Sequence, residues 1–179
     1  AGVLMGRSII LTGPMGSGKT SVGRLLADRL GYDFTDLDAL IVEQSGSSIN
    51  QLFADEGEAA FRDRETAALS GLIGRQDMVL STGGGVVIRE ENRALLHAAG
   101  VVANLTASPE ELTARLAQAD DRPLLRGDIP LEERICQIMT SREPFYADAD
   151  IRIDTTGKTL EDVAAVILEF YTEKRPGAL

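Results

Sequence analysis

One segment constrains this chain more than any other: Gly13 to Thr20, which reads GPMGSGKT and matches the phosphate-binding pattern G-x-x-x-x-G-K-[ST]. The pattern is informative when a strand precedes it and a helix follows. Here the apolar run SIIL ends just before it, and a helical pattern begins at Lys19. Glycine adopts the positive φ angles that reverse the chain in so few residues, so successive N–H groups can face a phosphate at a helix N-terminus. We therefore predict an α/β protein that binds a nucleoside triphosphate.

The residue types of this loop predict how it holds ATP. Lys19 brings a positive charge to the β- and γ-phosphate oxygens, and Thr20 brings a hydroxyl to Mg²⁺. The residues that we expect to bind ATP here are Gly16, Ser17, Gly18, Lys19, Thr20 and Ser21. The alternative, a merely glycine-rich turn, requires chance agreement at four fixed positions. The loop alone does not separate a kinase from an ATPase or a GTPase, although no guanine-reading N-K-x-D segment is evident.

Short β-rich runs alternate with longer helical patterns, which predicts a parallel sheet between helices. The expected strands are 8–11, 33–36, 78–81, 101–105 and 151–153. The expected helices are 19–30, 57–72, 91–99, 109–118, 131–147 and 160–173. No repeat or Pro/Ser-rich linker divides the 179 residues, so we expect a single domain over 1–179. The irregular, charged stretch 119–130 is either a surface loop or a mobile lid.

The charge balance and the cysteine count exclude several classes of protein. A net charge of −10 opposes nucleic acid and anionic membrane partners, so an anionic substrate needs a local group of Arg and Lys. One cysteine and one histidine exclude an intramolecular disulfide and a Cys/His metal site. We find neither a segment apolar enough to span a membrane nor a cleavable signal pattern. We expect a cytoplasmic monomer.

Two aspartates follow the second expected strand, at the sheet edge where open α/β folds bind ligands. We expect Asp36 near Mg²⁺, beside Thr20. Asp38 is expected to accept hydrogen bonds from substrate hydroxyls and to take the proton of the attacking one. The alternative for Asp38 is an N-cap of a helix that begins near Ala39.

Two further groups predict an acceptor site, and the first of them points to an acceptor that carries a carboxylate. Arg62 has Glu65 three residues later to hold its guanidinium, and Phe53 and Phe61 suggest an apolar wall beside it. This favours carboxylate recognition over an ordinary solvated run of charges. Three consecutive glycines, 83–85, follow the third strand and let a ligand approach the backbone closely, the alternative being a flexible turn.

Together these segments resemble those of shikimate kinases. The matching segments are GPMGSGKTSVGRLLA, FTDLD, FADEGEAAFRDRE, STGGGVV, RPLL and SREPFY, in this order, and the resemblance spans about residues 10–154. It implies transfer of the γ-phosphoryl group of ATP, with Mg²⁺, to the 3-hydroxyl of shikimate in chorismate biosynthesis. It also implies the three-layer nucleoside monophosphate kinase fold with strand order 2-3-1-4-5, a substrate-binding region at about 37–65 and a lid at about 119–130.

The resemblance assigns roles to individual residues. The shikimate-binding residues that it implies are Asp38, Arg62, Gly83, Gly84, Gly85 and Arg142. The implied catalytic residues are Lys19, Asp38 and Arg122, and the implied metal-site residues are Thr20 and Asp36. Arg122 is the lid arginine that reaches the transferred phosphate, and Arg115 is the adenine-side arginine. A second adenine-side arginine is not evident in 154–158.

Three rival functions make different demands on the sequence. A gluconate-type sugar-acid kinase also binds a carboxylate and hydroxyls, but the G-E-x-x-F-R and G-G-G combination favours shikimate. A nucleoside monophosphate kinase needs a second base-binding segment, which is not evident. A non-catalytic ATP-binding regulator should lack Lys19, Asp38 or Arg122, and all three are present.

Overall fold

The computed structural model describes residues 8–117 and 129–174. Its sheet has five parallel strands in the order β2-β3-β1-β4-β5. The strands are β1 (Ser8–Thr12), β2 (Asp33–Asp36), β3 (Met78–Ser81), β4 (Gly100–Thr106) and β5 (Ile151–Asp154). This confirms the predicted α/β fold and its strand order.

The central strand β1 explains why the sheet is parallel and covered on both faces. All five of its residues are buried, and Ile9 pairs with Val79 on one side and with Val101 on the other. A strand buried on both faces needs an almost continuous apolar run, which the sequence SIIL provides. Successive side chains point to opposite faces, so Ile9 and Ile10 belong to different clusters of the core.

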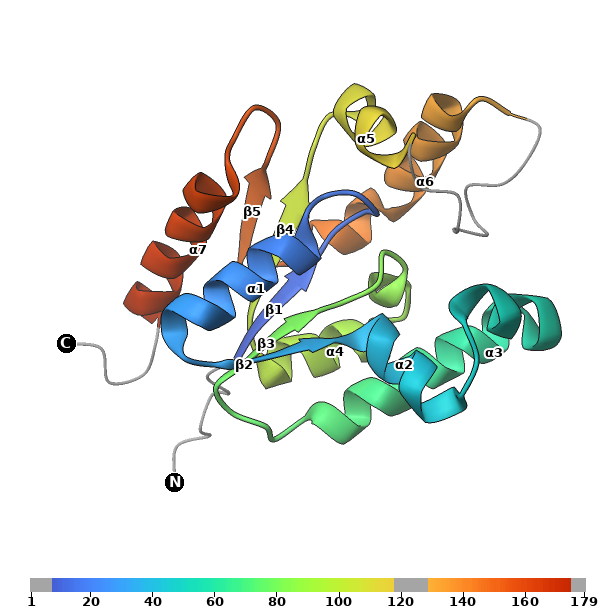
Figure 1. Cartoon of the computed structure of the whole chain (residues 1–179), viewed down its shortest axis with the longest axis horizontal. Coiled ribbons are helices and arrows are strands. Elements are labelled where there is room, and N and C mark those ends of the chain that lie inside the picture. The colour runs from blue at the N-terminus through green and yellow to red at the C-terminus, as the bar shows by residue number, and fades with distance from the viewer. Residues whose placement is uncertain (1–7, 118–128, 175–179) are drawn as a thin grey trace.

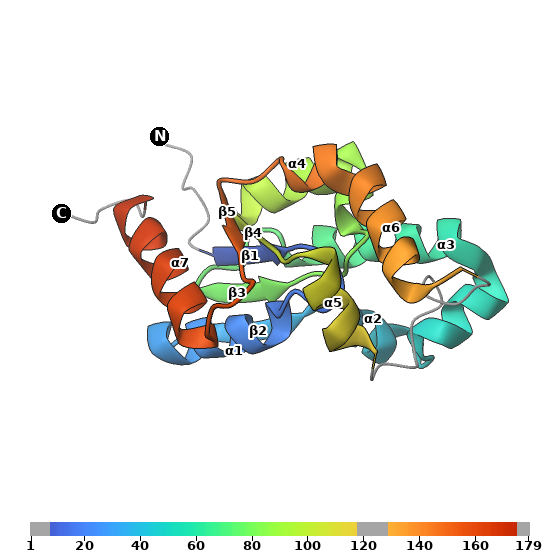
Figure 2. The ribbon, with the colours of Figure 1, turned by 90° about the horizontal axis from the view of Figure 1, so that it is seen from above.

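Helices cover both faces of the sheet and complete three layers (Figures 1 and 2). The helices are α1 (Lys19–Leu30), α2 (Leu37–Ser45), α3 (Ile49–Leu72), α4 (Glu90–Ala99), α5 (Pro109–Leu116), α6 (Leu131–Tyr146) and α7 (Leu160–Lys174), with a short 3₁₀ helix at Val86–Ile88. Helices α1 and α7 pack on the face that carries Ile9. Helices α3, α4 and the end of α6 pack on the face that carries Ile10.

The region between β2 and β3 differs from the sequence prediction. Helix α2 was not among the six expected helical ranges and entered only with the alternative for Asp38, as a helix that begins near Ala39. Helix α3 begins at Ile49 instead of residue 57. The expected start marks a real feature, because Gly57 has φ 85° and ψ 173° and interrupts the helix there. Helix α2 is short and buries only Leu37 and Ile41, so its apolar pattern is weak. Elsewhere the described elements agree with the predicted ranges to within about two residues.

Candidate active site

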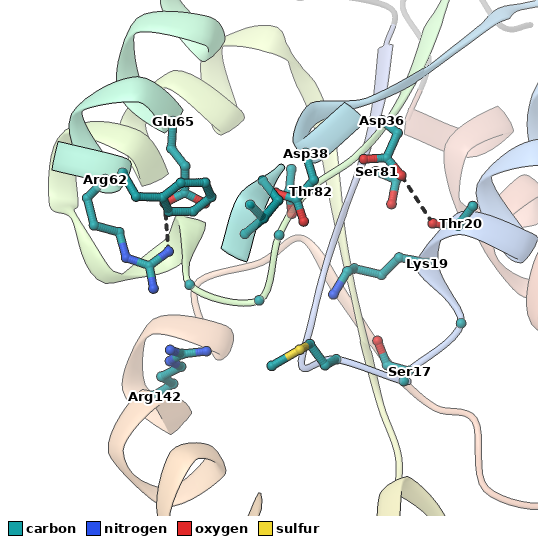
Figure 3. Close-up of a pocket in the computed structure, with 18 of the residues that line it drawn as sticks. Ser17, Lys19, Thr20, Asp36, Asp38, Arg62, Glu65, Ser81, Thr82 and Arg142 are labelled. Carbon is teal, nitrogen blue, oxygen red and sulfur yellow. Dashed lines mark hydrogen bonds and ion pairs between the residues drawn. The ribbon is translucent and has the colours of Figure 1, made fainter. Parts of the chain in front are cut away.

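A cavity of about 260 Å³ lies at the carboxyl ends of β1, β2 and β3 (Figure 3). It is lined by the loop before α1, the start of α2, the middle of α3, the turn after β3 and one residue of α6. The lining residues that the sequence analysis named for a site are Gly16, Ser17, Gly18, Lys19, Thr20, Ser21, Asp36, Asp38, Arg62, Gly83, Gly84, Gly85 and Arg142. Segments far apart in the sequence thus form one cavity.

The phosphate-binding loop owes its shape to its glycines. Gly13 has φ 141°, and a Cβ at this position would overlap the carbonyl oxygen of Leu105 in β4. Glycine is therefore required both by the backbone angle and by the close approach of the neighbouring strand. Lys19 is 8% exposed, and its Nζ donates to the carbonyls of Gly13 and, at 3.1 Å, of Pro14. The ammonium group therefore lies against the inside of the loop.

Asp36 links the phosphate-binding loop to the second strand. Its Oδ1 accepts a hydrogen bond from the N–H of Ala39 at 3.1 Å, which makes Asp36 the N-cap of α2. Its Oδ2 accepts from Thr20 Oγ1 at 3.4 Å. The helix cap that the sequence suggested for Asp38 is thus provided by Asp36. Asp38 lies in the first turn of α2 and lines the cavity.

Arg62 and Glu65 form a buried ion pair on α3, with side chains that are 8% and 1% exposed. Arg62 Nη1 donates to Glu65 Oε1 at 2.8 Å, and Nη2 donates to Glu58 Oε1 at 3.2 Å. Burial lowers the pKa of Arg62, but the two glutamates outweigh it and raise the pKa above its ordinary value. Burial raises the pKa of Glu65, and Arg62 opposes this only in part. The guanidinium lies 5.5 Å from the centre of the Phe61 ring, which forms part of the expected apolar wall.

The three glycines begin a segment that we call the glycine turn, residues 83–88. A Cβ on Gly83 would lie 2.9 Å from Asp38 Oδ1, and one on Gly85 would overlap the guanidinium of Arg62. A Cβ on Gly84 would lie 3.4 Å from Arg142 Nη1. The absence of side chains at Gly83, Gly84 and Gly85 therefore makes room for the charged groups of the cavity, which a merely flexible turn would not need.

One predicted arginine, Arg115, does not line this cavity. Arg115, on α5, donates from Nη1 to the carbonyl of Gly16 at 3.0 Å and to Thr155 Oγ1 at 3.2 Å. It therefore joins the phosphate-binding loop to the segment that follows β5. Arg122 and residues 119–128 of the expected lid lie outside the described residues.

Sequence reasoning missed several lining residues. Met15, Ile49, Ser81 and Thr82 also border the cavity. Thr82 Oγ1 donates to the carbonyl of Leu11 at 2.7 Å and ties the end of β3 to β1. Its position at a strand end, directly before the glycines, was the available signal.

The fold and the cavity define a P-loop kinase that acts on a small molecule: a phosphate-binding loop and buried arginines meet at the carboxyl edge of a parallel sheet. The family model for shikimate kinase matches residues 15–172. A shikimate kinase of Geobacter metallireducens is 58% identical over 161 residues, which cover 90% of this chain and 89% of that protein. The chain belongs to the shikimate kinase family.

Further relatives extend this similarity to sequence and structure. A shikimate kinase of Geobacter sulfurreducens is 53% identical over 94% of this chain and 92% of that protein. A solved structure of shikimate kinase from Acinetobacter baumannii in complex with shikimate superposes with a TM-score of 0.90, at 36% identity and over 97% of each chain. Among the residues that the structure describes, no helix is both long enough and apolar enough to cross a membrane.

Proposed function

We propose that this chain transfers the γ-phosphoryl group of Mg-ATP to the 3-hydroxyl of shikimate, which yields ADP and shikimate 3-phosphate. The proposal rests on one observation: a single cavity is bordered by the phosphate-binding loop and by the buried arginines Arg62 and Arg142. In a chain with a net charge of −10, two buried arginines beside a phosphate site indicate a small anionic acceptor.

Arg62 and Arg142 are the proposed carboxylate ligands. Each is only 7% exposed, and they reach the cavity from different helices, α3 and α6. Among the described residues, no hydrogen-bond acceptor reaches the buried Nε of Arg62. Since a buried donor is costly to leave without a partner, this position favours an acceptor atom from a ligand. A carboxylate can satisfy such donors with charge-assisted hydrogen bonds.

The loop before α1 is the proposed site of the ATP phosphates, with Arg115 on the adenine side. Thr20 and Asp36 fit a Mg²⁺ ion, since Mg²⁺ is usually held by one or two protein oxygens together with waters and substrate phosphates. Thr20 Oγ1 and Asp36 Oδ2 lie 3.4 Å apart, so the two oxygens are neighbours beside the loop. Bound there, Mg²⁺ would neutralise charge on the β- and γ-phosphates.

Asp38 is the proposed base and orienting group for the acceptor. As the 3-hydroxyl oxygen bonds to the γ-phosphorus, its proton passes to Asp38, and the bond to the β-γ bridging oxygen breaks with its electron pair leaving on ADP. Lys19 stabilises the charge on the transferred group, and we assign Arg122 the same task from the 119–130 segment. Closure of that segment would exclude water and so suppress hydrolysis of ATP.

We also propose that the protein acts as a cytoplasmic monomer without a nucleic-acid partner. The net charge of −10 supports the last point. The large exposed apolar side chains among the described residues are Ile73, Ile129, Leu160 and Val166. They come from three separate segments, since Leu160 and Val166 both lie on α7, and this scatter argues against an extensive apolar interface. Size-exclusion chromatography with light scattering tests the monomer, and a larger mass would contradict it.

ADP release measured with shikimate, quinate, gluconate and AMP as acceptors tests the proposed function. We expect turnover with shikimate to exceed turnover with each of the others by at least about tenfold in kcat/KM, as expected for a site with several oriented charged contacts. Preference for gluconate would instead support the sugar-acid kinase. ADP release that does not depend on any acceptor would contradict a kinase altogether.

A further inference from the structure

The carbonyl groups of the glycine turn are all held by donors of the protein. Local backbone N–H groups donate to two of them, from Val86 to Gly83 and from Ile88 to Gly85, each at 3.2 Å. Side chains of α4 and α6 donate hydrogen bonds to the other four carbonyls. The side-chain contacts are Tyr146 Oη to Gly84 O at 2.6 Å, Asn92 Nδ2 to Val86 O at 3.0 Å, and Arg93 Nη1 to Val87 O at 2.7 Å and to Ile88 O at 3.2 Å.

Tyr146 makes the contact nearest to the proposed chemistry. It is the last residue of α6, one helical turn after Arg142, and is 3% exposed. Burial raises the pKa of its phenol, although Arg142 opposes this, so the group keeps its proton and remains a donor at neutral pH. Its ring belongs to the core cluster beneath the sheet, which leaves the hydroxyl little freedom to move.

The hydrogen bond from Tyr146 determines the orientation of one peptide group. In a planar trans peptide, the carbonyl of Gly84 and the N–H of Gly85 point in opposite directions. Holding this carbonyl against α6 therefore directs the N–H of Gly85 away from α6. No acceptor among the described residues takes the N–H of Gly84 or of Gly85. Glycine has the widest choice of backbone angles, so an external hydrogen bond is what restricts this peptide.

Gly84 occupies a tightly bordered position. A Cβ built on it would lie 3.4 Å from Arg142 Nη1 and 3.6 Å from the backbone nitrogen of Met15. The backbone here thus separates an arginine proposed to bind the carboxylate from the phosphate-binding loop. A small displacement of this peptide would change the distance between Arg142 and the phosphate-binding loop.

Asn92, on α4, holds the second half of the glycine turn through its hydrogen bond to the carbonyl of Val86. It is fully buried, and its Oδ1 accepts from Thr66 Oγ1 at 2.8 Å on α3, the residue after Glu65. It thereby connects the glycine turn to the helix that carries Arg62. With Tyr146 on α6, the turn is fixed to both helices whose arginines enter the cavity.

We propose that Tyr146 is a positioning residue for the acceptor site, which rests on the proposed function. Its hydroxyl holds the Gly84 peptide so that Arg142, the glycine turn and the phosphate-binding loop keep the spacing that an acceptor and the γ-phosphate require together. Tyr146 itself need not touch either substrate.

The test compares Tyr146→Phe with a matched loss of a tyrosine hydroxyl elsewhere. Tyr146→Phe keeps the ring in the core and removes the hydroxyl, and with it the hydrogen bond to Gly84 and the interaction with the Arg142 side chain. The control is Tyr32→Phe, because the Tyr32 hydroxyl bonds to the Tyr171 hydroxyl at 2.7 Å, away from the cavity. Steady-state kinetics and thermal midpoints are measured for both. We expect Tyr146→Phe to lower kcat/KM for shikimate roughly 3- to 10-fold, the range for loss of one hydrogen bond, with KM for ATP within about twofold. Tyr32→Phe should retain wild-type kinetics.

The possible results separate the positioning role of Tyr146 from the proposed function of the chain. Wild-type kinetics in Tyr146→Phe, whatever its thermal midpoint, overturns the positioning role, as does an equal loss of ATP affinity. A wild-type chain that does not phosphorylate shikimate contradicts the proposed function instead. In that case amide hydrogen exchange still tests whether Tyr146 holds the glycine turn in place. Exchange across residues 83–88 should be faster in Tyr146→Phe than in Tyr32→Phe. Equal exchange in the two variants overturns it.

Discussion

Glu65 accepts a hydrogen bond from Arg62 at 2.8 Å, and both side chains lie within the wall of the cavity. Because the two residues are three positions apart on α3, they share one face of the helix. Glu65 fixes the guanidinium plane, and the pair keeps a buried positive charge compensated before any ligand arrives. The net attraction for an anionic acceptor therefore comes from Arg62 and Arg142 together, with Glu65 as the counter-charge.

Glu65→Gln should lower the free energy of unfolding by about 1–3 kcal/mol, because it leaves the buried guanidinium of Arg62 with only the exposed carboxylate of Glu58. Urea denaturation measures the change. The matched control is Glu56→Gln on the same helix, which loses the exposed pair with Arg64. That loss should cost much less than the loss of the buried pair, because an ion pair exposed to water contributes little to stability. An equal loss of unfolding free energy in the two variants would mean that the buried ion pair stabilises the fold no more than the exposed one.

Arg62→Ala and Arg142→Ala should each raise KM for shikimate by about one to two decades, since a charge-assisted hydrogen bond is worth roughly 1.5–3 kcal/mol. KM for ATP should stay within a few-fold. Arg64→Ala is the control, because its side chain is 38% exposed and does not line the cavity. Comparable effects on both substrates would place the two arginines outside the acceptor site.

Lys19→Ala should abolish phosphoryl transfer with little loss of fold, since the backbone of its loop is shaped by glycines and by the close approach of β4. Activity and the thermal midpoint are measured on the same preparation. A midpoint that falls enough to account for the lost activity would contradict a direct role.

Asp38→Asn should lower kcat by about two or more decades, a typical share for general base catalysis, and leave ATP affinity nearly intact. The variant keeps the shape of the side chain but removes its charge and basicity. The cap of α2 remains, because Asp36 provides it. A near-normal kcat at unchanged stability would remove Asp38 from the mechanism.

Local sequence patterns predicted the parts of this molecule that depend on local geometry. The glycines and Lys19 of the phosphate-binding loop follow from the turn that phosphate binding demands. The pairing of Arg62 with Glu65 follows from helical spacing. Strand order followed from the family resemblance rather than from the pattern of strands, because strand spacing alone does not specify which strands are neighbours.

Other features depend on contacts that no local pattern encodes. Tyr146 and Gly84 are 62 positions apart, and nothing near either residue indicates their hydrogen bond. Helix α2 was predicted only as an alternative, because few of its side chains are buried and because the short segment Asp36-Leu37-Asp38 resembled an extended turn. In α3, residues 49–56 form a helical segment that the expected range 57–72 did not include, and Gly57, the expected start, is where the backbone leaves the helical region.

The position of the new phosphate in the product tests the central claim most directly. Wild-type protein is incubated with ATP, Mg²⁺ and shikimate, and the product is examined by ³¹P–¹H correlation NMR. If Asp38, Arg62 and Arg142 orient the acceptor as proposed, one new phosphomonoester signal should appear, coupled to the proton on C3 of shikimate. A phosphate on another hydroxyl would contradict the proposed orientation, and signals of ADP and inorganic phosphate without a phosphomonoester signal would contradict phosphoryl transfer to shikimate.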